Sequence, residues 1–168
     1  MNVAKNIHIR NNIKFKKVIL LYHSFATATH IYQGNMDSDK SILMKAFNKL
    51  FFEFLDDIIS VYPDNVDMLT SKESFLTIKK MNPTSIIRVW FSGVYTKYHQ
   101  QIDAGDIDFF TDKDYSPDLT KVKNVNNILE IINNVREPIK NMDAKSKEHV
   151  KKYVQDLSKL SVAYAAIQ

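Results

Sequence analysis

The sequence predicts an all-α fold, a single-domain helical bundle of five or six helices over residues 1–168. Apolar side chains recur at helical spacing along most of the chain. Hydrophobic residues make up 45% of it, enough to bury a core, and three glycines with four prolines leave few of the turns that an all-β fold needs. Since neither a linker nor an internal repeat divides the chain, we expect one domain.

The first 36 residues are basic, with five Lys or Arg side chains and no acid. Residues 1–13 contain four asparagines, so we expect a flexible basic arm there. Apolar spacing predicts a helix over residues 14–32 that ends near Gly34. The runs 7–9 and 18–22 fit a strand equally well, and that alternative stays open.

The strongest helical pattern predicts a helix from an N-cap at Ser38 or Asp39 to Tyr62. Pro63 ends it, because proline lacks an N–H donor and collides with the preceding turn. The apolar stripe is wide and therefore predicts the central core helix. Its members are Ile42, Leu43, Ala46, Phe47, Leu50, Phe51, Phe54, Leu55, Ile58, Ile59 and Tyr62.

Two helices should follow. The tetrapeptide 70–73, Thr-Ser-Lys-Glu, has capping-box spacing and predicts a helix over 70–81. Asn82 as a cap and Pro83 at the first helical position predict another over 83–104, closed by Gly105.

The remaining chain divides at the acidic segment. Residues 105–119 should form a turn and loop, Asp118 should cap a helix over 118–136, and a last helix should span 138–166.

Composition excludes several chemistries. Without cysteine there is no thiolate ligand, disulfide or cysteine nucleophile. The three glycines, Gly34, Gly93 and Gly105, are too far apart for a phosphate-binding glycine loop, and no Gly-x-Ser-x-Gly motif occurs. The histidines His8, His23 and His30 lack the spacing of metal ligands. We therefore expect no catalytic residues, no metal, no cofactor and no enzyme activity. The lack of a targeting or membrane-spanning segment favours a cytoplasmic protein.

Residues 103–118 carry six aspartates against one lysine. From Asp112 the oxygen side chains start as in a calcium loop, but Pro117 and Lys123 stand where such a loop needs glycine and glutamate. Because of these two departures, a metal-dependent enzyme that uses this Asp-rich loop ranks third among the hypotheses. We expect the acidic side chains to shape turns instead.

Aromatic residues gather next to this acidic segment. We expect Trp90, Phe91 and Phe109 in the core, and unequal burial of Tyr95 and Tyr98. Gly93 inside a helix suggests the close approach of another helix or partner. The leading hypothesis is a non-catalytic interaction module that binds a protein or a second copy of itself. Its interface candidates are Tyr95, Tyr98, Phe110, Asp112, Asp114 and Tyr115.

Nucleic-acid binding is the alternative function. Basic side chains at both ends of the chain could contact phosphates, although 20 lysines against three arginines disfavour base reading. The candidates are Lys5, Arg10, Lys14, Lys16, Lys17, Lys151 and Lys152.

A pattern within residues 86–119 bears on the origin of the chain. The residues that carry it are Val89-Trp90, Tyr95, Tyr98, Ile102, Asp106, Phe109-Phe110, Asp114-Tyr115 and Asp118-Leu119. This pattern, with the Ile-, Lys- and Asn-rich composition, resembles uncharacterised helical proteins of large double-stranded DNA viruses. The resemblance implies a viral protein with a structural, accessory or virion role, located in the host cytoplasm or the virion, and it implies no catalytic residue.

Overall fold

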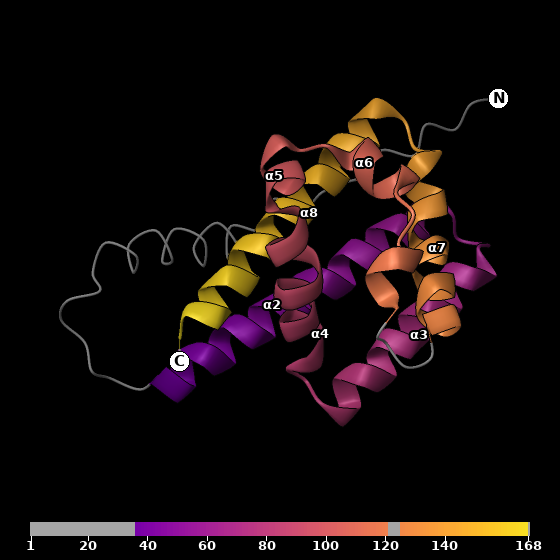
Figure 1. Ribbon diagram of the computed structural model, residues 1–168. Helices are drawn as coiled ribbons and strands as arrows, with labels where there is room; N and C mark the ends of the chain where they lie inside the picture. The colour runs from indigo at the N-terminus through magenta and orange to yellow at the C-terminus, as the bar shows by residue number, and fades with distance from the viewer. Residues whose placement is uncertain (1–35, 121–124, 168) are drawn as a thin grey trace.

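The computed structural model describes residues 36–120 and 125–167, all of which form helices, turns or short connections without a strand (Figure 1). The predicted all-α class is thereby confirmed. The α-helices are α2 (Met36–Val61), α3 (Val66–Met81), α4 (Ser85–Val89), α5 (Thr96–Ala104), α6 (Ile107–Asp112), α7 (Val125–Lys140) and α8 (Ala144–Ala166). A π-helix, η1 (Trp90–Tyr95), joins α4 to α5, and a 3-10 helix, η2 (Ser116–Leu119), follows α6. The predictions for residues 1–35, including the basic arm and the helix over 14–32, lie outside the described residues.

The long helices α2 and α8 lie side by side and form the centre of the bundle (Figure 1). Phe47, Leu55 and Ile58 of α2 and Leu157 of α8 are almost completely buried. Burying such a side chain contributes about 1.5–3 kcal/mol, so this contact is a main source of stability. The prediction that α2 is the central core helix is confirmed, and the helix ends before Pro63 as expected.

Two predicted helix starts are wrong. Helix α2 already includes Met36, so Ser38 and Asp39 lie inside its first turn. There the negative charge of Asp39 interacts favourably with the helix dipole. Helix α3 begins at Val66, because Asn65 Oδ1 accepts from the backbone N–H of Met68. The Thr-Ser-Lys-Glu tetrapeptide therefore lies within α3 and caps nothing. Ser71 is buried there and its hydroxyl accepts from the Asn134 amide.

The predicted helix over 83–104 is three consecutive segments. It starts at Ser85, because Asn82 Oδ1 accepts from both the N–H and the hydroxyl of Thr84 and holds 82–84 as a turn. Residues 90–95 are π-helical, with the Thr96 N–H donating to the Phe91 carbonyl five residues back. Tyr98 departs from helical geometry at φ −128°. Gly105 closes the run with a left-handed φ of 71°, as predicted.

The remaining boundaries also need correction. Residues 105–119 are not a loop, because Asp106 Oδ1 caps α6 through the Phe109 N–H and η2 follows. Asp118 lies in η2 and does not cap the next helix. Helix α7 continues through Pro138 to Lys140, and α8 starts only after Asp143 caps it through the Ser146 N–H. The break between the last two helices thus lies at 141–143.

Candidate interaction surface

Three aromatic residues of the predicted interface, Tyr98, Phe110 and Tyr115, come together with Phe109 where α5, α6 and η2 meet, whereas Tyr95 stacks elsewhere, on Phe91. Ring centroids of Tyr98, Phe109, Phe110 and Tyr115 lie 5.2–6.3 Å apart, mostly edge to face. Such geometry is favourable for aromatic pairs. We call these four residues the tyrosine cluster.

Tyr98 is at the centre of this cluster and is only 8% exposed. Its hydroxyl donates to Asp118 Oδ2 at 2.5 Å, and Lys113 Nζ lies 3.1 Å from the same oxygen. The Tyr98 hydroxyl, helped by Lys113, lowers the pKa of Asp118, while burial raises the pKa of Tyr98. The prediction that Tyr98 is an interface residue is therefore wrong, because its ring and hydroxyl are occupied within the fold.

Phe110 and Tyr115 are half-buried and hold the segment 107–119 together. The Tyr115 hydroxyl donates to the Phe110 carbonyl at 3.1 Å, and the Arg136 guanidinium of α7 lies over the Tyr115 ring. Burial raises the pKa of Tyr115 to about 12. Both side chains pack α6 and η2 against their neighbours, which leaves little of either ring for a partner. Phe109, expected in the core, is also half-buried here.

The acidic candidates have partners inside the chain. Asp112 accepts from Lys140 at 2.8 Å, and that contact lowers its pKa. Asp114 accepts from the Ser116 backbone N–H at 2.9 Å, which lowers the pKa of Asp114. Asp108 pairs with Lys147. Within residues 36–120 and 125–167, no group of three or more histidines or carboxylates is placed to hold a metal ion.

The nucleic-acid candidates do not form one described surface. Lys151 pairs with Glu148 at 2.5 Å and lays its stem beside Gly105, whereas Lys152 is exposed. The five N-terminal candidates, Lys5, Arg10, Lys14, Lys16 and Lys17, lie outside the described residues.

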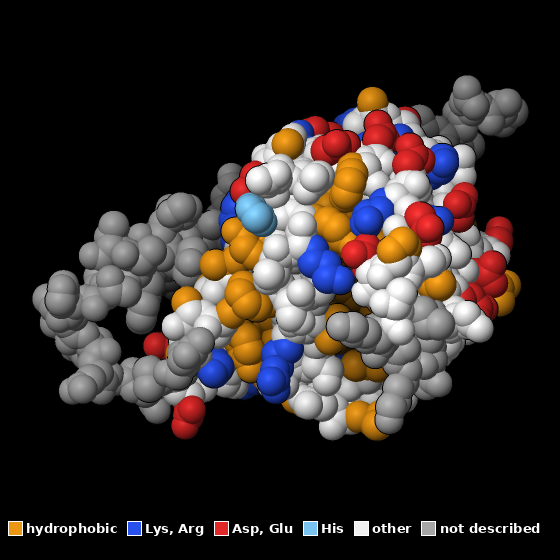
Figure 2. Space-filling model, viewed as in Figure 1, with side chains coloured by type: hydrophobic (Ala, Val, Ile, Leu, Met, Phe, Trp, Pro, Cys, Tyr) orange, Lys and Arg blue, Asp and Glu red, His pale blue; other side chains and the backbone are white. Residues whose placement is uncertain are grey.

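A different aromatic row runs along η1 and α5, with two half-buried rings and one exposed ring. The Phe91 and Tyr95 rings stack with centroids 6.2 Å apart, and the Tyr95 and His99 rings follow at 5.9 Å. We call Phe91, Tyr95 and His99 the aromatic ladder. Tyr95 is half-buried where Tyr98 is buried, which confirms their predicted inequality. Apolar side chains gather in strips on both sides of the α4–η1–α5 run (Figure 2).

The π-helix determines which rings face the core. Trp90 donates from Nε1 to the Ser158 hydroxyl of α8 at 3.0 Å and packs edge to face on Phe47, as its predicted core role requires. Phe91, the next residue, is half-buried and is not part of the core cluster, contrary to prediction. Val89, one residue earlier, is 64% exposed. The segment is thus anchored on one side and exposed on the other.

Gly93 lies within this segment, and its predicted close contact is absent from the described residues. A Cβ built on Gly93 meets only the Val89 side chain, at an ordinary 3.9 Å. The residues Phe91, Tyr95 and His99 at i, i+4 and i+8 were the sequence signal for the ladder. The same spacing also fits a core-facing position for Phe91, which is why the pattern alone does not reveal the ladder.

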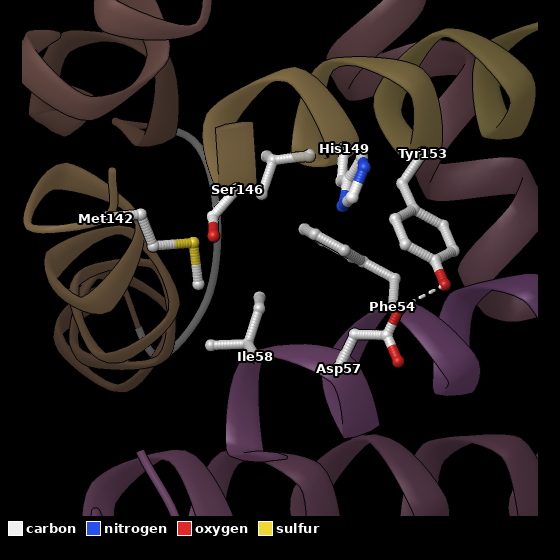
Figure 3. A pocket seen from close by; sticks show the side chains of 8 residues that line it. Phe54, Asp57, Ile58, Met142, Ser146, His149 and Tyr153 are labelled. Carbon is white, nitrogen blue, oxygen red and sulfur yellow. Dashed lines mark hydrogen bonds between the residues drawn. The ribbon is translucent and has the colours of Figure 1, made fainter. Parts of the chain in front are cut away.

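A small cavity between α2 and α8 has polar groups of the kind that hydrolases use (Figure 3). However, Asp57 accepts from Tyr153 at 2.5 Å, and Ser146 bonds to Asp143. No serine–histidine–aspartate chain of hydrogen bonds links the residues drawn, and a nucleophile needs such a base. The volume of about 10 Å³ is suited to one water molecule. The cavity is too small for a substrate.

No protein-family model matches this chain, and no curated protein or solved structure is significantly similar to it. The resemblance to viral proteins stays a prediction, as does a place in the host cytoplasm or virion. Among the described helices, none is both long and apolar enough to cross a bilayer.

Proposed function

We propose that this chain is a non-catalytic interaction module that binds a protein partner through the aromatic ladder. The observation that carries the proposal is the stacking of these three rings along η1 and α5, where His99 is exposed and Phe91 and Tyr95 are half-buried. The same run is anchored in the core by Trp90, which donates to Ser158 of α8.

The chemistry of this surface suits a protein. Aromatic residues are enriched at the centres of protein interfaces, where large rigid rings lose little conformational entropy on binding. A π-helical segment frequently marks a functional position in a helix. The partner that fits best is an amphipathic helix, which places apolar side chains at i, i+3 and i+4 against such a surface.

The tyrosine cluster is a weaker candidate for the same role. Its hydroxyls, carboxylates and cations bind one another, and a partner would have to replace those contacts. The phosphate-backbone alternative rests mainly on residues outside the described ranges and remains a prediction.

The experiment selects binders from a displayed library of helical peptides on the full chain and then compares two aspartate variants. His99→Asp introduces a negative charge into the ladder at its exposed residue and should weaken selected peptides by at least about tenfold, as a lost interface hot spot does. Val66→Asp is the matched control, because Val66 is 69% exposed on α3, and it should change affinity less than about twofold.

Other results of these measurements would contradict the proposal or change the identity of the partner. A library that yields no binder, or binders equally affected by both variants, contradicts the proposal. Sedimentation equilibrium on the chain alone, showing a dimer that His99→Asp dissociates, would make a second copy the partner. Binding of random RNA that His99→Asp abolishes and that falls steeply with salt would replace the protein with a nucleic acid.

A further inference from the structure

An open groove lies between α2 and the end of α3, closed at one side by the turn at Pro83. Its volume is about 480 Å³, which lies within the range of small-molecule sites and far exceeds the cavity of Figure 3. Met44, Phe52 and Pro83 give it apolar walls. The groove can therefore accept the body of a small organic molecule.

The charged groups that line the groove leave a positive excess. Glu53 pairs with Lys49 at 3.7 Å, and Asp56 pairs with Lys72 of α3. Lys45 and Lys79 also line the groove, and neither has a carboxylate within 4.0 Å among the residues that the structure describes. The Lys79 ammonium lies 5.0 Å from the centre of the Phe52 ring, which holds this charge beside an apolar wall.

Asn48 supplies a fixed polar group at the inner side of the groove. It is 3% exposed, and its Nδ2 donates to the Pro83 carbonyl at 2.8 Å, which ties the turn to α2. Its Oδ1 is buried and accepts from no group within the described residues. Because this oxygen is closed off from solvent, Asn48 fixes the inner side of the groove and does not itself contact a ligand.

We propose that this groove binds a small amphipathic organic anion: an aromatic or aliphatic body between Met44, Phe52 and Pro83, with a carboxylate, sulfonate or phosphate at Lys45 and Lys79. The apolar walls supply affinity, while the two ammonium groups select negative charge. The site is separate from the aromatic ladder and does not depend on the proposed partner.

The first test titrates the full chain with 8-anilinonaphthalene-1-sulfonate and, in parallel, with the neutral N-phenyl-1-naphthylamine. We expect saturable binding of the sulfonate, and the double variant Lys45→Gln/Lys79→Gln should raise its Kd by at least about tenfold. Binding of the neutral compound should change less than about twofold, because the apolar walls are retained. Lys80→Gln, next to the groove residue Lys79 but outside the lining, is the matched control.

The second test locates the probe. In the ¹³C-methyl methionine spectrum, the Met44 signal should shift saturably with the sulfonate, while the buried Met68 and Met142 signals stay in place. Circular dichroism melts check that every variant is folded. The proposal is overturned if the sulfonate does not saturate at millimolar concentration, if the double variant and Lys80→Gln bind alike, or if Met44 does not respond.

Discussion

The tyrosine cluster and the aromatic ladder are built from similar residues but are used differently. In the cluster, Tyr98 and Tyr115 donate to Asp118 and to the Phe110 carbonyl, and the rings join α5, α6 and η2. In the ladder, the stacked rings are neighbours on the same helical run, from Phe91 to His99. The comparison teaches that aromatic content alone does not identify a binding surface. What matters is whether the rings and hydroxyls already have partners within the fold.

Truncating one tyrosine from each region should give the largest contrast. Tyr98→Ala removes a buried ring and should lower the free energy of unfolding by about 3–5 kcal/mol. Tyr95→Ala removes a half-buried ring and should cost only about 1 kcal/mol. Urea denaturation followed by circular dichroism measures both. Equal losses would mean that the ladder is as much a part of the core as the cluster.

Removing only the Tyr98 hydroxyl tests the charged hydrogen bond within the cluster. Tyr98→Phe should cost about 2 kcal/mol at pH 7, because hydrogen bonds to charged groups contribute about 1.5–3 kcal/mol. The folded pKa of Asp118 lies below its unfolded value, so this stabilisation is present above the unfolded pKa and is lost as pH falls through the folded pKa.

The difference between wild type and Tyr98→Phe should therefore shrink when unfolding is measured near pH 2 instead of pH 7. Tyr115→Phe is the control, because its hydroxyl donates to a backbone carbonyl that does not titrate. A Tyr98→Phe cost that is the same at both pH values would show that Asp118 does not accept this bond as a carboxylate.

Alanine substitutions at two glycines should have smaller effects on stability, and the two effects should be opposite in sign. Gly93→Ala should raise stability by about 0.5–1 kcal/mol, because the helix gains propensity and the new methyl meets only Val89. Gly105→Ala should lower it by about 1–2 kcal/mol, because φ is +71° and the Lys151 stem occupies the space. Thermal melts of both variants measure this. A destabilising Gly93→Ala would show that the π-helix needs glycine for its backbone.

Much of the fold followed from local sequence. The wide stripe of α2 identified the central helix, Pro63 ended it, and Gly105 closed α5. Errors arose where two local signals competed. Asn65 caps α3 upstream of the Thr-Ser-Lys-Glu tetrapeptide, which therefore lies inside the helix. Asp106 caps a short helix in the segment whose composition predicted a loop.

The candidate site was predicted less well. The predicted unequal burial of Tyr95 and Tyr98 is confirmed, but Phe91, predicted in the core, is half-buried, and Tyr98, predicted at the interface, is buried. Helical spacing tells which residues share a face and not which face meets the core. The π-helix, which lengthens one turn by a residue, changes that relation after Trp90.

The sequence by itself determined that the described chain is helical and where several helices end, because these properties depend on side chains a few residues apart. Only the tertiary structure decided the use of each aromatic and acidic group. Tyr98 meets Asp118 20 residues away, and Trp90 meets Ser158 68 residues away. Contacts over such separations depend on how whole helices pack, and no local pattern encodes them.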